Sequence, residues 1–356
     1  MDLFGRFSDG DDLALTSARP EPWRISSWVA MAALQKGIRR DDTCVALRAA
    51  STLLDQDPAR LWRRLLGICF EDVGLAAFDR VQLVVEKLSA NSRTLVGPRG
   101  WKIAAELVTL LCSATKDRSS DDLFIAATYH PQLATARSEV ERLSNAEKLM
   151  RLGEPGALLS KAVIISDLAP SRWKNRSAPW VPPRLIWDAL SRAGSPAEHL
   201  RISEAGYRKT REILPMMLSL LACSSSGHGP SSSPESPLSK ALANELPTYA
   251  IDVFSHEGKV CLAGFLRSQT DTARWFRDQV HPLRRVKILG GLLFRVEGAV
   301  VNCRLRNNVA DALKSLADEG FHGDPNLHIA DAASLLATDL ETLDDIRTAT
   351  IASWSV

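Results

Sequence analysis

Acidic and imidazole side chains are the groups in this sequence that could transfer protons. Glu71 and Asp72 are adjacent, and His256 precedes Glu257. Neighbouring residues on a helix point in different directions, so Glu71 and Asp72 do not present two carboxylates to one substrate. A histidine beside a carboxylate can act as a general acid or base, but no nucleophile stands at a recognisable spacing from His256 or His322. We expect both histidines to be caps or surface residues.

The sequence motifs that mark the common enzyme classes are absent. There is no GxxxxGK[ST] phosphate loop, GxSxG nucleophile elbow, HExxH zinc motif or GxGxxG dinucleotide motif. The six cysteines are far apart and form no CxxC pair, which indicates core residues in a reducing compartment rather than a disulfide framework. We therefore expect a protein that is not an enzyme, needs no cofactor or metal, and neither binds nor hydrolyses ATP. The alternative is an enzyme that uses scattered residues such as His256, Glu257 and Arg304.

Two segments carry an excess of basic residues that could bind phosphates. Eight basic residues face four acids between Arg24 and Arg64, and eight face two between Arg274 and Arg306. Such a segment is usually a solvated surface, but clustered cations can also lie along a phosphate backbone. The candidate DNA contacts are Arg39, Arg40, Arg63, Arg64, Arg284, Arg285, Lys287, Arg295, Arg304 and Arg306.

Length and composition are typical of a folded protein with two domains. The chain has 356 residues, of which 45% are hydrophobic and 24% charged, and its net charge of +2 does not by itself indicate a nucleic-acid partner. Residues 1–22 lack the basic and apolar regions of a secretory signal and are expected to form a mobile tail. No apolar run is long enough to cross a membrane. We expect a cytoplasmic protein that could associate with the nucleoid.

Apolar residues at helical spacing predict an antiparallel helical bundle over residues 23–222. Leu47, Ala50 and Leu54, for example, would form one buried stripe. The candidate N-caps of the first three helices are Ser26 or Ser27, Asp41 or Asp42, and Asp57 before Pro58. Prolines interrupt the pattern over residues 154–196, where Trp173, Trp180 and Trp187 could either anchor an irregular segment to its own domain or bind a partner.

A composition change divides the chain after the predicted bundle. Residues 223–238, CSSSGHGPSSSPESPL, have almost nothing to bury and are predicted to be a linker. Residues 239–356 mix helical stretches with two β-branched runs, 292–296 and 300–305, that flank Glu297-Gly298-Ala299 and predict a β-hairpin. The predicted fold class is mainly α, with an N-terminal helical bundle and a smaller α+β domain that contains a hairpin.

The segment 28–76 contains an ordered series of short motifs, which ends in Glu71-Asp72-Val73-Gly74-Leu75-Ala76. This series resembles the helical, collar-like region that follows the ATPase module in the replication-associated recombination protein A (MgsA) family of AAA+ ATPases, which are related to clamp loaders. With the later Ala114-Thr115-Lys116 step, the resemblance covers about 90 residues. The residues that carry the motif are Leu34, Lys36, Arg39, Glu71, Asp72, Gly74 and Lys116.

The resemblance implies a function in DNA transactions. In that family the helical region packs subunits together, and the whole protein acts on DNA at stalled or damaged replication forks. The ATPase module is missing ahead of the motif, so ATP-driven remodelling is not expected, whereas self-association through residues 25–113 is. We therefore expect a non-enzymatic DNA replication or repair accessory protein that forms homo-oligomers and binds DNA or replication-fork proteins. A protein–protein adaptor without DNA contact and an enzyme with an unrecognised site are the alternatives.

Overall fold

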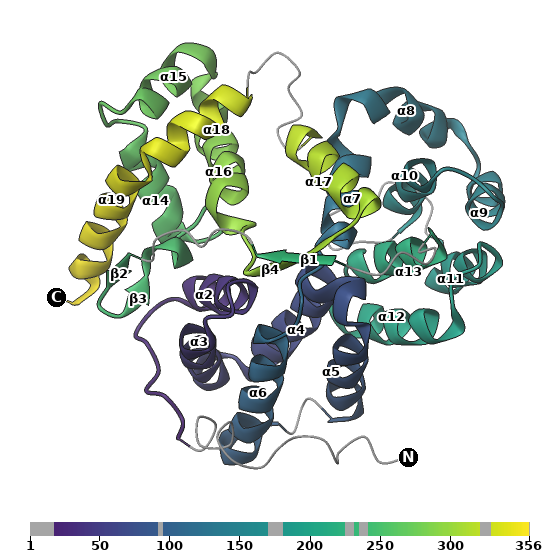
Figure 1. Ribbon diagram of the computed structural model, residues 1–356, viewed down its shortest axis with the longest axis horizontal. Helices are drawn as coiled ribbons and strands as arrows, with labels where there is room; N and C mark the ends of the chain where they lie inside the picture. Colours follow the sequence, from purple (N-terminus) through teal and green to yellow (C-terminus); the bar gives the residue numbers. More distant parts are fainter. Residues whose placement is uncertain are drawn as a thin grey trace.

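The computed structural model describes residues 18–91, 95–169, 181–224, 231–234, 241–320 and 329–355. Over these residues the chain is mainly helical, with two small antiparallel sheets of two strands each, so the predicted fold class is confirmed (Figure 1). Most of the predicted tail, much of the predicted linker, and both Trp173 and Trp180 lie outside the described residues. Trp187 is described and is 7% exposed.

The first half of the chain is built from helices joined by short connections. They are α2 (Ser27–Arg39), α3 (Thr43–Gln56), α4 (Pro58–Ile68), η1 (Cys69–Val73), η2 (Gly74–Ala77), α5 (Phe78–Asn91), α6 (Gly97–Cys112), α7 (Ser119–Tyr129), η4 (Pro131–Leu133), α8 (Ala134–Arg142), α9 (Asn145–Gly153), α10 (Leu158–Leu168), α11 (Pro183–Arg192), α12 (Ala197–Thr210) and α13 (Leu214–Ser224). The side chains of Ser26, Asp42 and Asp57 accept hydrogen bonds from the first turns of α2, α3 and α4. These bonds satisfy backbone amides that have no partner inside the helix.

The second half mixes helices with four very short strands. Its elements are β1 (Ser231–Pro234), β2 (Leu242–Ala243), β3 (Leu246–Pro247), η5 (Thr248–Ala250), α14 (His256–Phe265), α15 (Asp271–Gln279), η6 (Pro282–Arg284), α16 (Arg285–Leu293), η7 (Phe294–Gly298), β4 (Cys303–Arg306), α17 (Asn308–Gly320), α18 (Ile329–Thr338), α19 (Leu340–Ala352) and η8 (Ser353–Ser355).

The hairpin predicted over residues 292–305 is wrong in its position. Residues 292–298 instead complete α16 and form the π-helical turn η7. The prediction failed because a short apolar run fits a buried helix as well as it fits a strand. Only β4 is extended, and it pairs with β1, which lies within the predicted linker. The second half does contain a hairpin, formed by β2 and β3. Asn244 and Glu245 connect these strands with positive φ angles, as a tight two-residue turn requires.

Two hydrophobic clusters divide the described structure into lobes. We call the helices α2–α13 together with α17 the first lobe, and α14–α16, α18 and α19 the second lobe. One cluster fills the first lobe and takes in a few residues of the second half, and the other lies among the helices of the second lobe. Although α17 comes late in the sequence, it packs against α7 (Figure 1). The chain therefore crosses from the second lobe to the first and back.

Candidate functional site

Asp72 is a fully buried carboxylate in the last part of the motif, the segment 71–76. It lies in η1, directly after α4, and none of its surface is exposed. Arg39 donates through Nε to Oδ1 at 2.7 Å, Gln35 donates to Oδ2 at 2.7 Å, and Arg118 also pairs with Oδ1. Burial alone would raise the pKa of Asp72, but the charges of Arg39 and Arg118 outweigh it and hold the pKa below its ordinary value. Asp72 therefore stays ionised and joins α2 to the start of α7.

The motif has a glycine two residues after its acidic pair, and the backbone conformation of Gly74 explains this choice. Its φ of +55° is in the region that favours glycine, and an added Cβ would lie 2.6 Å from the carbonyl oxygen of Asp117. The backbone of Asp117 also donates to the carbonyl of Asp72 at 2.9 Å, and Leu75 N–H donates to the Asp117 carboxylate at 3.0 Å. Asp117 thus bonds the motif turn through both its backbone and its side chain.

Lys116 is buried and binds the end of a helix. Its Nζ donates to the carbonyls of Leu111 at 3.1 Å and Cys112 at 2.7 Å, and also to that of Ala114. The Leu111 and Cys112 carbonyls lie in the last turn of α6, where the helix dipole favours a cation. Burial lowers the pKa of Lys116. Its backbone also pairs with β4, since Lys116 N–H donates to the carbonyl of Cys303 at 2.8 Å.

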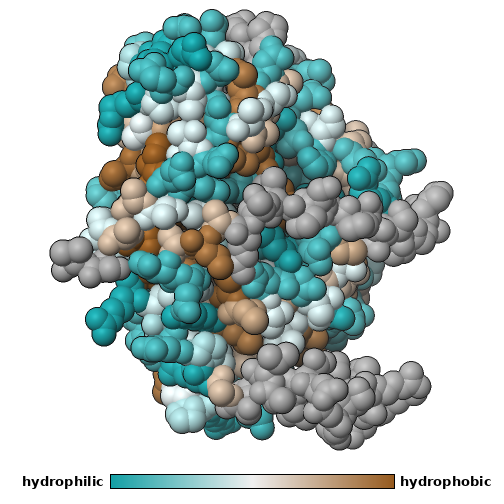
Figure 2. All heavy atoms as spheres, turned by 60° about the vertical axis from the view of Figure 1, so that its left-hand side comes forward, coloured by the Kyte–Doolittle hydropathy of each residue, from teal (hydrophilic) through white to brown (hydrophobic). Residues whose placement is uncertain are grey.

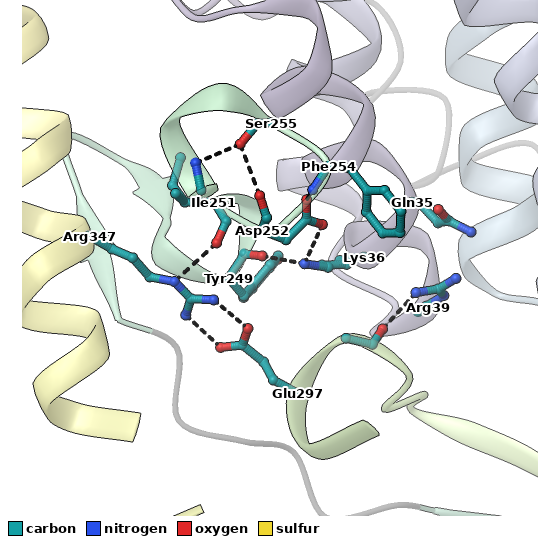
Figure 3. Close-up of polar contacts among 12 residues, drawn as sticks. Gln35, Lys36, Arg39, Tyr249, Ile251, Asp252, Phe254, Ser255, Glu297 and Arg347 are labelled. Carbon is teal, nitrogen blue, oxygen red and sulfur yellow. Dashed lines mark hydrogen bonds and ion pairs between the residues drawn. The ribbon is translucent and has the colours of Figure 1, made fainter. Parts of the chain in front are cut away.

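The motif residues of α2 reach the second half of the chain. Lys36 Nζ lies 2.9 Å from the Asp252 carboxylate and 2.6 Å from the carbonyl oxygen of Tyr249 (Figure 3). Arg39 Nη1 donates to the carbonyl of Gly298 at 2.6 Å. Arg40 donates to the carbonyl of Glu297 at 2.8 Å and stacks over the Tyr249 ring. The helix that carries the motif is therefore held on one side by η5 and η7.

Glu297 and Arg347 form a second buried ion pair at this junction. Both nitrogens of the Arg347 fork bond the carboxylate, at 2.9 and 2.8 Å, and Nε donates to the carbonyl of Ile251 at 3.1 Å (Figure 3). Burial would raise the pKa of Glu297, but the charge of Arg347, with weaker help from Lys36 and Arg40, lowers it to about 2. We call the ion pairs of Asp72, Lys36 and Glu297 the junction network.

Sequence reasoning did not find the pair of Glu297 with Arg347. It assigned Glu297 to a hairpin loop, and Arg347 was noticeable only as a single basic residue in an acidic helical stretch. A lone arginine among acids on a predicted helix is a weak signal for a buried partner elsewhere in the chain. The motif residues, by contrast, were found, and the structure brings them together in one region.

Most of the predicted DNA contacts have partners inside the protein. Besides Arg39 and Arg40, Arg64 contacts Gln35 and lies 4.0 Å from Glu71. The pairs in the second half are Arg295 with Asp318 at 3.4 Å, Arg304 with Asp122 at 3.7 Å and Arg306 with Asp311 at 2.8 Å. Arg304 is only 5% exposed. Exposure is a separate property: Arg306 is exposed although it is paired, and Arg63, Arg284 and Lys287 are exposed as well.

The acid–base candidates gain no catalytic partners that the described structure reveals. His256 is exposed at the first position of α14, and Ser255 supplies the cap of that helix by accepting from Gly258 N–H at 2.9 Å. His322 lies outside the described residues. Within the described ranges, no group of three or more His, Cys, Asp or Glu side chains could hold a metal ion. No helix in these ranges is both long and apolar enough to cross a membrane.

A basic groove lies between the helices of the second lobe. Its volume is about 630 Å³. The lining residues are Ala263, Leu266, Arg267, Gln269, Arg277, Pro282, Arg285 and Val286. Arg285 is one of the predicted DNA contacts. The other two arginines of the groove, Arg267 and Arg277, were not among the predicted contacts. We call this feature the arginine groove.

Comparison of this chain with known proteins found no match. No family model, curated protein or solved structure matches it. The resemblance to the collar-like region of the AAA+ family therefore stays a prediction from the motif.

Proposed function

We propose that this protein is a non-enzymatic accessory protein of DNA replication or repair that works by binding DNA, replication-fork proteins and copies of itself. The observation that carries the proposal is the position of the motif residues. Leu34, Lys36, Arg39, Asp72 and Lys116 are each at most 4% exposed, and the charged ones are bound to carboxylates or carbonyls of the same chain. Lys36 and Arg39 join α2 to the second half of the chain, whereas Asp72 and the side chain of Lys116 bind groups of the first lobe. The motif residues are thus used inside the protein, and binding is left to its outer surface.

DNA contact, on this proposal, is made by exposed residues of the basic segments, among them three that lie on helices. Arg63 lies on α4, Arg284 at the end of η6, and Lys287 in the first turn of α16. Cations at the surface can displace the counterions condensed on DNA, which makes binding weaken as salt rises. The internal pairs of Arg39 and Arg304 leave those side chains buried, so they are not part of the proposed contact.

The test is the salt dependence of binding by the full chain to a labelled DNA duplex. Replacing Arg63, Arg284 and Lys287 with glutamine should reduce the slope of log affinity against log salt by roughly 0.9 for each phosphate that the variant no longer binds, or about 0.7 on a single strand. The matched control is Arg208→Gln, an exposed arginine of α12 that pairs with Glu204. A triple variant with unchanged slope and affinity would remove DNA from the proposal.

Self-association must be tested on the full chain. The fragment 25–113 would expose the face of α2 that η5 and η7 cover in the complete protein, and it could then associate through a surface that is normally buried. We expect sedimentation velocity of the intact protein to show a dimer or a larger species. A strictly monomeric protein at tens of micromolar would contradict this part of the proposal.

A protein–protein adaptor without DNA contact is the second candidate, and the arginine groove favours it. A pull-down with and without nuclease separates the two functions. Partners that stay bound after nuclease treatment support the adaptor, and partners that disappear after it support binding through DNA.

A further inference from the structure

We propose that the arginine groove binds an acidic peptide segment of a partner protein, with Arg277 and Arg285 holding its carboxylates and the aliphatic floor holding its apolar side chains. This inference goes beyond the proposed function, because it needs neither DNA nor self-association. Three observations support the inference. They are the way in which the two arginines are held, the lining of the groove, and an exposed leucine that follows the lining residue Pro282 in the chain.

Backbone carbonyls fix both guanidinium groups in place. Arg277 Nη1 donates to the carbonyls of Leu266 at 2.8 Å and Ser268 at 2.9 Å. Arg285 donates through Nε to the carbonyls of Phe276 at 3.1 Å and Val280 at 2.8 Å, and through Nη2 to that of Arg277 at 2.8 Å. Phe276 and Arg277 belong to the last turn of α15, and Leu266 and Val280 directly follow the ends of α14 and α15. Carbonyls at helix ends can accept such side-chain donors, because they have few partners within the helix.

This arrangement orients the two arginines without neutralising them. A carbonyl oxygen accepts a hydrogen bond but carries no net charge, and in the described part of the chain neither Arg277 nor Arg285 forms an ion pair with a carboxylate. Arg277 Nη2 and Arg285 Nη1 make no hydrogen bond among the described residues. A guanidinium that is already fixed loses little freedom when it binds a carboxylate, which it can do through two parallel hydrogen bonds.

The rest of the groove is suited to a peptide. Ala263, Leu266, Pro282 and Val286 give it an aliphatic floor, and its volume lies within the usual range for ligand sites. No aromatic ring is among its lining residues, so it lacks the stacking surface on which single-stranded nucleic acids bind. We therefore favour an acidic peptide over a nucleic acid.

Leu283 is an exposed apolar residue next in the chain to the lining of the groove. It follows Pro282 in η6, and 89% of its surface is exposed. Figure 2 views the molecule with the second lobe turned towards the reader, and on this face apolar residues form separate patches among hydrophilic ones. Arginine is enriched among the residues that dominate binding energy at protein interfaces. A ligand that alternates acidic and apolar residues would satisfy both features.

Fluorescence anisotropy with the full-length protein tests the inference. The probe is a short labelled peptide in which Asp alternates with Leu, compared with the same peptide carrying Asn in place of Asp, with poly-aspartate, and with a single-stranded oligonucleotide. We expect the Asp–Leu peptide to bind most tightly. Arg277→Gln should weaken its binding about tenfold, the loss expected for a charged hydrogen-bonded contact. Arg274→Gln is the matched control, because it changes an exposed arginine of the same helix that pairs with Asp271 and does not line the groove.

Because Arg277 also binds the end of α14, Arg277→Gln could unfold the lobe. Arg267→Gln and Leu283→Asn change exposed side chains, so they test the groove in a folded protein, and each should weaken peptide binding several-fold. The inference is overturned if the Asp–Leu peptide binds no better than its Asn version, if folded variants bind it as well as the wild type does, or if the oligonucleotide is the ligand that depends on Arg267. Failure of the duplex DNA test alone leaves these results unaffected.

Discussion

Arginine residues occupy two contrasting environments in this protein. In the junction network and beside it, Arg39, Arg118 and Arg347 are at most 2% exposed and pair with carboxylates. In the arginine groove, Arg277 and Arg285 are partly exposed and donate to backbone carbonyls. The charge of an arginine that is bound to a carboxylate is neutralised within the ion pair. An arginine that is bound to carbonyls is held in a fixed position and keeps its net charge. The first arrangement joins parts of the fold, and the second leaves a cation available to a ligand.

The largest expected effect is on the carboxylate at the centre of the junction network. Asp72→Asn would remove the charge that Arg39 and Arg118 share while leaving both arginines buried. Breaking a buried ion pair in this way costs about 3 to 5 kcal/mol of unfolding free energy. Urea denaturation measures the loss. Asp188→Asn is the control, because Asp188 lies 3.8 Å from Arg184 on an exposed helix face and should contribute less than about 1 kcal/mol. Equal losses in the two variants would break the distinction between the environments.

The pair of Glu297 and Arg347 should give a smaller, pH-dependent effect. The pKa of Glu297 falls from 4.5 to about 2 on folding, so its contribution to stability is present above pH 4.5 and is lost as pH falls towards 2. The shift corresponds to about 3 kcal/mol. We expect Glu297→Gln to be destabilised most near neutral pH and the difference from wild type to shrink over that acid range.

The measurement compares unfolding free energies of wild type and Glu297→Gln at several pH values. Burial raises the pKa of Asp121 to about 7 and that of Asp122 to about 6, against the opposing charge of Arg118, and these groups reduce stability as pH rises from about 4 to 7. Their effect is common to both proteins, so the difference isolates Glu297. A difference that stays constant from neutral to acid pH would show that the carboxylate does not act through its charge.

The smallest effects are expected on strand β4, where two arginines stand two residues apart. Arg304 is buried near Asp122, and Arg306 is about half exposed and pairs with Asp311. Arg306→Gln should cost less than about 1 kcal/mol, whereas Arg304→Gln should cost about 1 to 3 kcal/mol because it leaves buried polar groups unpaired. Thermal or urea unfolding of the two single variants checks this order. Similar costs would mean that burial does not separate the roles of the two residues.

Much of the secondary structure was predictable from the sequence. The spacing of Leu47, Ala50 and Leu54 predicted α3, and the caps Asp42 and Asp57 were among the predicted candidates. These signals work because a helix repeats every 3.6 residues and its caps act within one turn. The run 292–296 failed for the same reason, since over five residues a buried helix and a strand carry the same apolar pattern.

The sequence by itself determined which residues form helices, where several of them begin, and which residues make up the motif. Only the tertiary structure decided what those residues touch. Arg39 bonds to Gly298, which is 259 positions away, and Arg347 to Glu297, 50 positions away. Local basic excess therefore overstated the charge available to DNA, because the carboxylates and carbonyls that bind these arginines come from distant parts of the chain. Helix periodicity is a property of neighbouring residues, whereas ion pairing depends on which elements pack together.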